Sequence, residues 1–535
     1  MKNSQGDQLF PIKLDRPKNM KNDILSGLTV ALALVPEAIA FAFIVGVNPT
    51  IGLYAAFMMG LVTALIGGRP GMISGATGAV AVIFKPMMDE LIPQVGMNGA
   101  LGYLFAAVVI MGIIQILFGV LKLGKFIRLV PHPVMLGFVN GLAIVIFRSQ
   151  FELFSTGHAE SFGEKALVLG VMGGLLLLTM GISYFLPKLT KAVPATLAAI
   201  VVVSGISLIL KKFDIPVLTV MDFVREKDST ITTLASSLPR FALPAIPLTG
   251  EAFMLILPFA FQAAAVGLIE SLMTLTLVDE LTDTRGRGNK ECVGQGVANI
   301  VNGFFGGMGG CAMIGQSVIN IRAGGRGRLS GAVAALGLLG FVLFGAPLIE
   351  NIPLAALVGV MFMVVIGTFE WSSFRIIRKI PLSDALVIVL VSIITVMFNL
   401  AIAVATGIIV SALVFAWEKG KHIEVEEQVD EKGTKVYKLD GLLFFGSVSS
   451  FKEIFNYNDD PVHVVIDFEK ARVHDHSGLE ALNFVAEKYA AQGKKLHLWN
   501  LSPECKSLVK KAESIVEITE IDGLEWFHIA DNSLA

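Results

Sequence analysis

Apolar segments follow one another along the chain from Ile24 to Trp417, and short polar loops separate them. A helix needs about 20 apolar residues to cross roughly 30 Å of hydrocarbon. The pattern predicts fourteen membrane segments, the third and tenth too short to span fully, at 24–45, 50–67, 72–84, 101–121, 126–148, 166–187, 193–210, 253–277, 290–304, 311–321, 329–347, 353–368, 381–399 and 401–417. A connection over 211–250 divides them seven and seven, and its Pro239, Pro244 and Pro247 disfavour helix.

Basic residues gather in alternate loops of this pattern. Lys13, Arg16, Lys18 and Lys21 precede the first segment, and further Lys and Arg residues occupy every second loop. Loops rich in Lys and Arg stay on the cytoplasmic side of a membrane. The chain is therefore predicted to lie in the cytoplasmic (inner) cell membrane with both ends in the cytoplasm, and the loop over 85–99 is predicted on the opposite side.

The character of the sequence changes near residue 420 to alternating, charged segments. Strands are predicted at 422–427, 436–445, 462–468 and 495–499, and helices at 477–492 and 502–512. The chain thus divides into a cytoplasmic N-terminal segment (1–22), a transmembrane domain (23–419) and a cytoplasmic α/β domain (420–535).

Composition narrows the class of protein further. Of the 535 residues, 54% are hydrophobic and 16% charged, well below the roughly 25% of a soluble chain. The net charge of -2 comes without a dense basic stripe, which argues against nucleic-acid binding. No P-loop, metal-ligand cluster or nucleophile–base spacing is present, so we expect neither an enzyme nor a cofactor, and an ion gradient as the energy source.

Two glutamates lie inside predicted membrane segments, where a charge is costly and needs a reason. Glu270 and Thr274 are four residues apart and share a helix face, so they could ligate Na⁺; the same carboxylate could instead carry a proton. Glu37 follows Pro36, which breaks the helical hydrogen-bond pattern and favours a polar pocket. Structural pairing at a helix interface is the alternative for both glutamates.

The two short segments are rich in glycine and small residues and occupy the third position of each half. Matched interruptions of this kind are typical of inverted-repeat transporters, and the N-termini of half-helices bind anions through backbone N–H groups. Close helix packing through small residues is the alternative. The candidate anion-binding residues are Ser74, Gly75, Ala76, Thr77, Gly78, Ala312, Met313, Ile314, Gly315, Gln316 and Ser317.

Four motifs are distributed along the chain: Ala31-Leu-Ala-Leu-Val-Pro-Glu-Ala38, Arg128-Leu-Val-Pro-His-Pro-Val134 with Gly137 and Gly141, Gly294-Gln-Gly-Val-Ala-Asn299, and Val318-Ile-Asn-Ile-Arg-Ala-Gly-Gly-Arg-Gly-Arg-Leu-Ser-Gly331. Together these motifs carry a specific resemblance, over nearly the whole chain, to the SulP family of anion permeases, which combine a fourteen-segment transporter with a C-terminal STAS domain.

The resemblance implies an anion site on Ser74–Ala79 and Ala312–Ser317, homodimers, and elevator-like movement of one helix bundle against another. The Pro-Glu-Ala and Ile-Glu-Ser-Leu-Met-Thr stretches look most like the bicarbonate transporters, which implies Na⁺ at Glu270 and Thr274. Many family members carry a basic residue where this chain has Gln316. Without that charge an anion depends more on a co-bound cation or on helix dipoles, which favours symport.

In the tail, His474-Asp-His-Ser-Gly478 resembles the STAS loop whose serine is phosphorylated in anti-sigma factor antagonists, and this implies a regulatory role for Ser477. Asp475 and Ser477 are equally suited to cap the helix N-terminus.

These features predict a secondary active transporter of a small inorganic anion, bicarbonate before sulfate, coupled to Na⁺. Proton-coupled or exchange transport of sulfate or a dicarboxylate, transport of a nucleobase, and a non-transporting regulator acting through the STAS domain remain alternatives.

Overall fold

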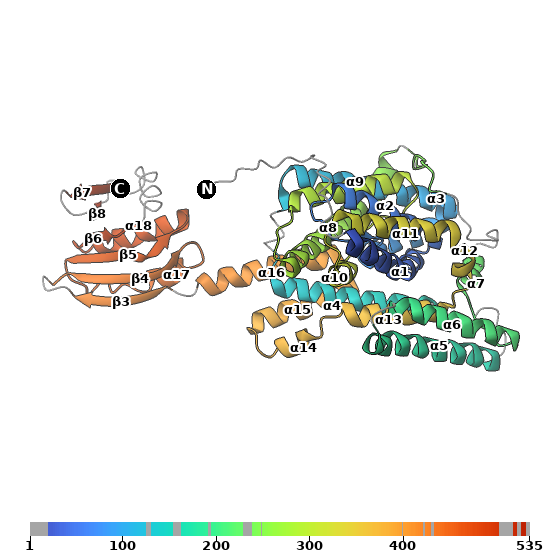
Figure 1. Ribbon diagram of the computed structural model, residues 1–535. Coiled ribbons are helices and arrows are strands. Elements are labelled where there is room, and N and C mark those ends of the chain that lie inside the picture. Colours follow the sequence, from blue (N-terminus) through green and yellow to red (C-terminus); the bar gives the residue numbers. More distant parts are fainter. Residues whose placement is uncertain are drawn as a thin grey trace. The chain divides into compact units, whose positions relative to one another are not determined.

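The computed structural model describes residues 20–124, 130–153, 162–190, 194–227, 238–247, 249–398, 400–420, 423–429, 433–501, 517–521 and 526–530. The chain forms two compact units, Met1–Ile408 and Ile409–Ala535. The first is helical and the second contains a β-sheet (Figure 1).

Two bundles of helices make up the first unit. One bundle, called the core bundle here, contains α1 (Met20–Val45), α2 (Pro49–Ile66), α3 (Gly78–Val120), α8 (Gly250–Thr282), α9 (Gly288–Phe304), α10 (Ile314–Arg322) and α11 (Arg328–Phe344). The other, called the gate bundle, contains α4 (His132–Ser149), α5 (Phe162–Leu189), α6 (Ala195–Lys212), α13 (Leu354–Thr368) and α15 (Leu382–Met397).

Short elements connect these helices: η2 (Gln150–Leu153), α7 (Val220–Lys227), α12 (Ala346–Glu350) and α14 (Ser372–Ile376), and α16 (Leu400–Gly420) follows. In Figure 1 the core-bundle labels lie above those of the gate bundle, and α1 and α3 make the main packing contacts with α13, α4 and α6.

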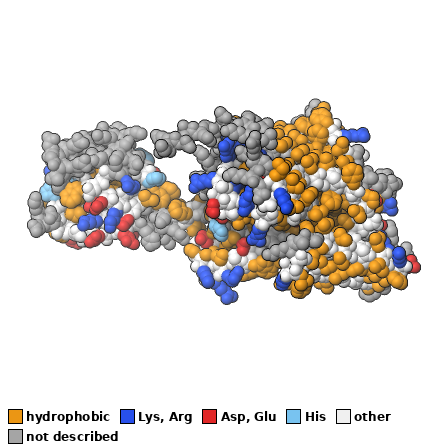
Figure 2. Space-filling model, viewed as in Figure 1, with side chains coloured by type: hydrophobic (Ala, Val, Ile, Leu, Met, Phe, Trp, Pro, Cys, Tyr) orange, Lys and Arg blue, Asp and Glu red, His pale blue; other side chains and the backbone are white. Residues whose placement is uncertain are grey.

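The helical unit has the surface of a membrane protein. Among the described residues, eight helices are long and apolar enough to cross a membrane, and three shorter helices are also apolar. Hydrophobic side chains cover much of the visible face of this unit, whereas the visible face of the sheet unit carries many charged ones (Figure 2). Apolar surface of this extent marks a lipid-facing protein.

Two connections differ from the sequence-based prediction. The stretch over 85–99, predicted as a loop, is helical, because α3 passes through it and only Gly96, at φ 71°, departs from helical geometry. Within 211–250 the eight-residue helix α7 was not predicted. It begins because Asp222 accepts hydrogen bonds from the backbone N–H and hydroxyl of Thr219 (2.9 and 2.7 Å). The described part that contains the three prolines has no helix, as predicted.

The second unit is a six-stranded sheet with the order β3-β4-β5-β6-β8-β7. Its strands are β3 (Glu424–Val429), β4 (Lys435–Leu443), β5 (His463–Val473), β6 (Lys495–Trp499), β7 (Glu517–Ile521) and β8 (Trp526–Ala530), and its helices are α17 (Val448–Lys452) and α18 (His476–Ala490). β4, β5 and β6 are parallel to one another. The core includes Tyr437, Phe451, Phe468, Leu482 and Tyr489.

Five predicted elements of this unit are confirmed: β3 to β6 and α18. The elements α17, β7 and β8 were not predicted, and the helix predicted at 502–512 lies outside the described residues.

Candidate functional site

Two extended segments cross in the middle of the core bundle. β1 (Ser74–Gly75) pairs antiparallel with β2 (Cys311–Ala312), with Ser74 opposite Ala312 and Gly75 opposite Cys311. The N–H of Met313 also donates to the carbonyl of Ile73 (2.9 Å). Glycine is required beside this crossing, because a Cβ at Gly310 would collide with the carbonyl oxygen of Gly75.

Each extended segment leads directly into a helix, so that the N-termini of α3 and α10 meet at the crossing. The residues before these helices, Thr77 and Met313, have extended geometry and make no side-chain capping bond. The first N–H groups of a helix have no partner within it and carry a positive partial charge. The crossing therefore has the physical properties of an anion-binding site.

One face of this site is open and another touches the gate bundle. Gly315, in the first turn of α10, is exposed, and an added Cβ there would meet no atom within 4 Å. At the start of α3, a Cβ on Gly78 would lie 2.8 Å from Cδ1 of Ile146 in α4. The crossing thus lies where the two bundles meet.

The candidate hydroxyl groups are used to hold the crossing together. Ser317 Oγ accepts from the N–H of Ile73 (3.0 Å), Ser74 Oγ accepts from Nε2 of Gln295 (2.8 Å), and Thr77 Oγ1 lies 3.2 Å from Cys311 Sγ. All three hydroxyl-bearing side chains are buried. The remaining candidates, Gly75, Ala76 and Ala312, are buried in the crossing itself, whereas Ile314 is half-buried at the start of α10.

Glu270 contacts the crossing from α8. Its carboxylate oxygen Oε2 accepts from the thiol of Cys311 (3.0 Å), and the next residue, Ser271, accepts from the N–H of Ala312 (3.1 Å). The hydroxyl of Thr274 donates to the backbone carbonyl of Glu270 (2.8 Å) and is fully buried. None of the Lys and Arg residues that the structure describes forms an ion pair with Glu270. A carboxylate and a hydroxyl oxygen on this face are suitable Na⁺ ligands.

Glu37 contacts the same broken segment from α1. Its side chain is 8% exposed, and its Oε1 accepts from Nε2 of Gln316 (2.7 Å). The preceding Pro36 has no N–H and leaves the carbonyl of Leu32 without its usual helical donor. The structure therefore connects both candidate glutamates to the segment between Cys311 and Gln316.

A further glutamate, Glu291, is buried and was missed in the sequence. Glu291 in α9 accepts from the N–H of Gly68 (2.6 Å) and from Nε2 of Gln295 (2.7 Å). Asn299, one turn further on, exchanges two hydrogen bonds with Gly310 at 3.0 Å. The signal was the spacing of Glu291, Gln295 and Asn299, which places polar residues every four positions on one helix face. This polar face of α9 supports both extended segments.

Ser477 lies in the sheet unit at the N-terminus of α18. Asp475 is the N-cap of this helix, and its two carboxylate oxygens accept from the N–H groups of Gly478 and Phe445, both at 2.9 Å. Ser477 is half-buried in the first turn. The capping role thus belongs to Asp475, and phosphorylation of Ser477 stays a prediction.

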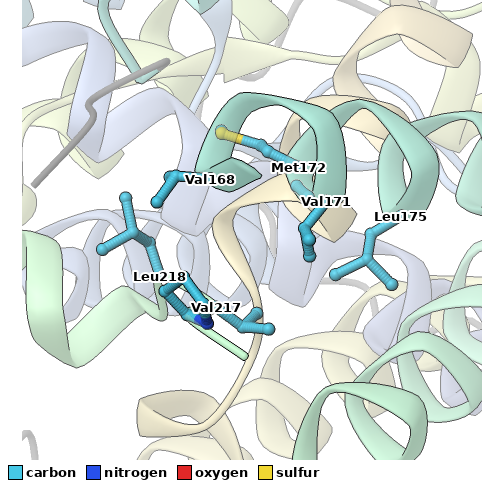
Figure 3. A pocket seen from close by; sticks show the side chains of 8 residues that line it. Val168, Val171, Met172, Leu175, Val217 and Leu218 are labelled. Carbon is cyan, nitrogen blue, oxygen red and sulfur yellow. The ribbon is translucent and has the colours of Figure 1, made fainter. Parts of the chain in front are cut away.

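A separate hollow in the helical unit has apolar walls (Figure 3). Val168, Val171, Met172 and Leu175 of α5 form one part, and the rest consists of Pro216, Val217, Leu218 and Ala355. Because the described residues that line it all have apolar side chains, it is unsuited to a small anion.

Broken helices that meet inside a bundle of apolar helices, beside buried carboxylates, define a membrane transporter. Comparison with known proteins gives the family. Residues 20–391 match the sulfate permease family and residues 423–522 match the STAS domain. The chain belongs to the sulfate permease family and carries a C-terminal STAS domain. Because this family consists of transporters, the prediction that the chain is not an enzyme is confirmed.

Individual relatives agree with this membership. The chain is 42% identical over 504 residues to "Putative sulfate transporter YbaR" of Bacillus subtilis (strain 168), which covers 94% of this chain and 99% of the relative. The solved transmembrane domain of a cyanobacterial bicarbonate transporter, BicA, is 31% identical, with a TM-score of 0.65 over 74% of this chain and all of that one.

The fold is also shared by a more distant structure. The murine Slc26a9 anion transporter in the inward-facing state is 16% identical, with a TM-score of 0.77 over 96% of this chain and 92% of that one. The predicted fold class is thereby confirmed as a helical membrane transporter with an α/β STAS domain.

Proposed function

We propose that the protein is a secondary active transporter that carries a small inorganic anion together with Na⁺. Bicarbonate is the favoured substrate and sulfate the second. The relatives support these two anions, since one bears the name of a sulfate transporter and the other is a bicarbonate transporter.

The contact between Glu270 and the crossing carries this proposal. The carboxylate binds the thiol of Cys311, and Cys311 begins the short segment that leads into the N-terminus of α10. A cation at Glu270 and Thr274 would therefore lie close to an anion at the N-termini of α3 and α10. Opposite charges attract strongly in a protein interior, so each ion would raise the affinity for the other, as symport requires.

The movement that we propose is an elevator-like shift of the core bundle against the gate bundle, with the anion carried by the core bundle. The site lies where the bundles meet, which is where such a shift exposes it to one side and then the other. We further propose fourteen crossings in a seven-plus-seven inverted repeat over 23–419, a homodimer, and location in the cytoplasmic membrane with 1–22 and the STAS domain (420–535) in the cytoplasm.

Uptake by proteoliposomes tests the proposal. Labelled bicarbonate and sulfate are offered at fixed pH with and without an inward Na⁺ gradient, to the parent protein and to Glu270→Gln. We expect Na⁺-dependent bicarbonate uptake by the parent and its loss in the variant, because the amide lacks the charge that holds Na⁺.

Other outcomes separate the alternatives. Uptake that does not depend on Na⁺ but depends on a pH gradient and on Glu270 would mean that the coupling ion is a proton and not Na⁺. Equal flux in the parent and in Glu270→Gln would remove Glu270 from the mechanism altogether.

A further inference from the structure

Gln316 has one satisfied and one unsatisfied polar atom in the first turn of α10. Its side chain is 3% exposed, and Nε2 donates to Glu37 Oε1 (2.7 Å). Its other polar atom, Oε1, is buried and has no hydrogen-bond partner among the described residues. A buried acceptor without a donor is unfavourable. A ligand that brings a donor to this point would relieve that cost.

The surroundings of Gln316 suit a small ligand. The neighbouring Gly315 is exposed, and a Cβ there would meet no atom within 4 Å. The same helical turn supplies the backbone N–H groups that attract an anion. One turn therefore offers donors for a charged oxygen and, at Gln316 Oε1, an acceptor for a hydrogen.

An anion that meets both demands carries a proton. Hydrogen carbonate has charged oxygens and one O–H group. Nitrate has the same planar shape and single charge without a proton, and sulfate has two charges and no proton. We propose that Gln316 selects protonated oxyanions, because its Oε1 accepts the O–H of hydrogen carbonate. This inference rests on the proposed function and specifies the substrate class of that site.

Glu37 is the positioning residue for this selection. A glutamine amide could present either its oxygen or its NH₂ group, and the carboxylate of Glu37 holds the NH₂ group toward α1. The acceptor, Oε1 of Gln316, therefore lies on the side of the amide that faces away from Glu37. When Glu37 is ionised, its charge repels a doubly charged anion more than a singly charged one, which discriminates against sulfate.

Binding to the full-length protein in lipid nanodiscs, with Na⁺ present and at a pH where hydrogen carbonate predominates, tests the assignment by calorimetric titration. We expect the parent to bind hydrogen carbonate at least about tenfold more tightly than nitrate, the effect of one buried hydrogen bond. Gln316→Met, which has neither polar group, should bind the two anions equally. Gln316→Lys, which has donors only, should prefer nitrate and sulfate.

Gln150 provides a matched control. It is fully buried at the end of α4, its Nε2 donates to Ile146 O (3.2 Å), and its Oε1 also has no partner among the described residues. Gln150→Met should keep the parent's preference, since it removes the same buried amide elsewhere.

Variants of Glu37 separate orientation from charge. Glu37→Gln keeps an acceptor for Gln316 Nε2, so it should retain the preference over nitrate but bind sulfate more tightly than the parent does. Glu37→Ala should lose the preference over nitrate.

Two results would overturn the inference while leaving transport intact: a parent that binds nitrate as tightly as hydrogen carbonate, or an unchanged ratio in Gln316→Met. If a variant fails to fold, the ratio of the parent's affinities for hydrogen carbonate and nitrate still tests the inference. Binding of neither anion would overturn the proposed function and this assignment together.

Discussion

Thr274 illustrates how a single side chain can serve the structure and the site at once. Its hydroxyl hydrogen is used by the carbonyl of Glu270 (2.8 Å), while its oxygen lone pairs stay available for a cation. Valine has the same shape without the oxygen. The substitution Thr274→Val therefore removes the oxygen proposed to bind Na⁺ and leaves the packing of α8 unchanged.

We expect Thr274→Val to raise the Na⁺ concentration for half-maximal uptake by about tenfold, the loss of one polar contact of roughly 1–2 kcal/mol. Bicarbonate uptake at saturating Na⁺ should change little. Thr276→Val is the control, because Thr276 donates to Leu272 O (2.9 Å) in the same way but is exposed. Equal Na⁺ dependence in both variants would exclude Thr274 as a ligand.

Asp460 gives a pH-dependent prediction in the STAS domain. Burial by itself would raise the pKa of this carboxyl, but hydrogen bonds from Tyr489 (2.5 Å), Tyr437 (2.7 Å) and Lys435 (2.9 Å) together lower it below its usual value. A pKa lower in the folded than in the unfolded state stabilises the fold above the unfolded pKa. That contribution is lost as the pH falls through the folded pKa.

Thermal unfolding of the full chain, followed by tryptophan fluorescence from neutral to acidic pH, measures this effect. The transition of the STAS domain should move to lower temperature in acid. Asp460→Asn should unfold at lower temperature at neutral pH and respond less to acid, since the titrating group is gone. Parallel pH profiles of parent and variant would contradict the prediction.

At the scale of elements, α9 is the support on which the crossing rests. Its polar face binds both extended segments, and its glycines bring it close to α3. A Cβ at Gly296 would lie 2.5 Å from the carbonyl of Gly112, and a Cβ at Gly112 would lie 2.5 Å from the carbonyl of Gly296. Small residues permit such close approach of membrane helices.

Gly296→Ala should therefore destabilise the helical unit by about 1–3 kcal/mol, because α3 and α9 must move apart. The measurement is the unfolding temperature in detergent micelles. Gly340→Ala in α11 is the control: a Cβ there meets no atom within 4 Å, and alanine favours helix, so stability should stay the same or rise slightly. Equal unfolding temperatures for the two variants would show that the contact tolerates a methyl group.

At the scale of the whole helical unit, the proposed function requires the core bundle to move against the gate bundle. Gly78 of α3 and Ile146 of α4 lie on either side of that boundary, with a Cβ on Gly78 3.3 Å from Cγ1 of Ile146. Because Cγ1 of Ile146 occupies the place that Sγ of a cysteine would take, cysteines at these two positions can form a disulfide.

Oxidation of the double variant Gly78→Cys/Ile146→Cys should abolish bicarbonate uptake, and reduction should restore it. The single variants control for the substitutions, since neither can form this bond. Full uptake by the cross-linked protein would mean that the anion crosses without relative movement of the two bundles.

The amino-acid sequence alone determined the apolar segments, the two interrupted ones and the STAS domain. These features are local, since the cost of a polar group in lipid, the helical period and the effects of glycine and proline all act within a few residues. The same local rules placed Glu37 and Glu270 inside the membrane. These local rules gave the wrong prediction at 85–99 and at Val220–Lys227, which are helical although their composition is typical of loops.

Only the tertiary structure decided which polar groups are partners. Ser74 binds Gln295, Ser317 binds Ile73 and Glu37 binds Gln316, across more than 200 residues in each case. The hydroxyl groups of Ser74 and Ser317 also hold the crossing together, while Oε1 of Gln316 has no hydrogen-bond partner among the described residues. A hydrogen bond depends on distances of about 3 Å, and folding, rather than sequence spacing, sets those distances between remote segments.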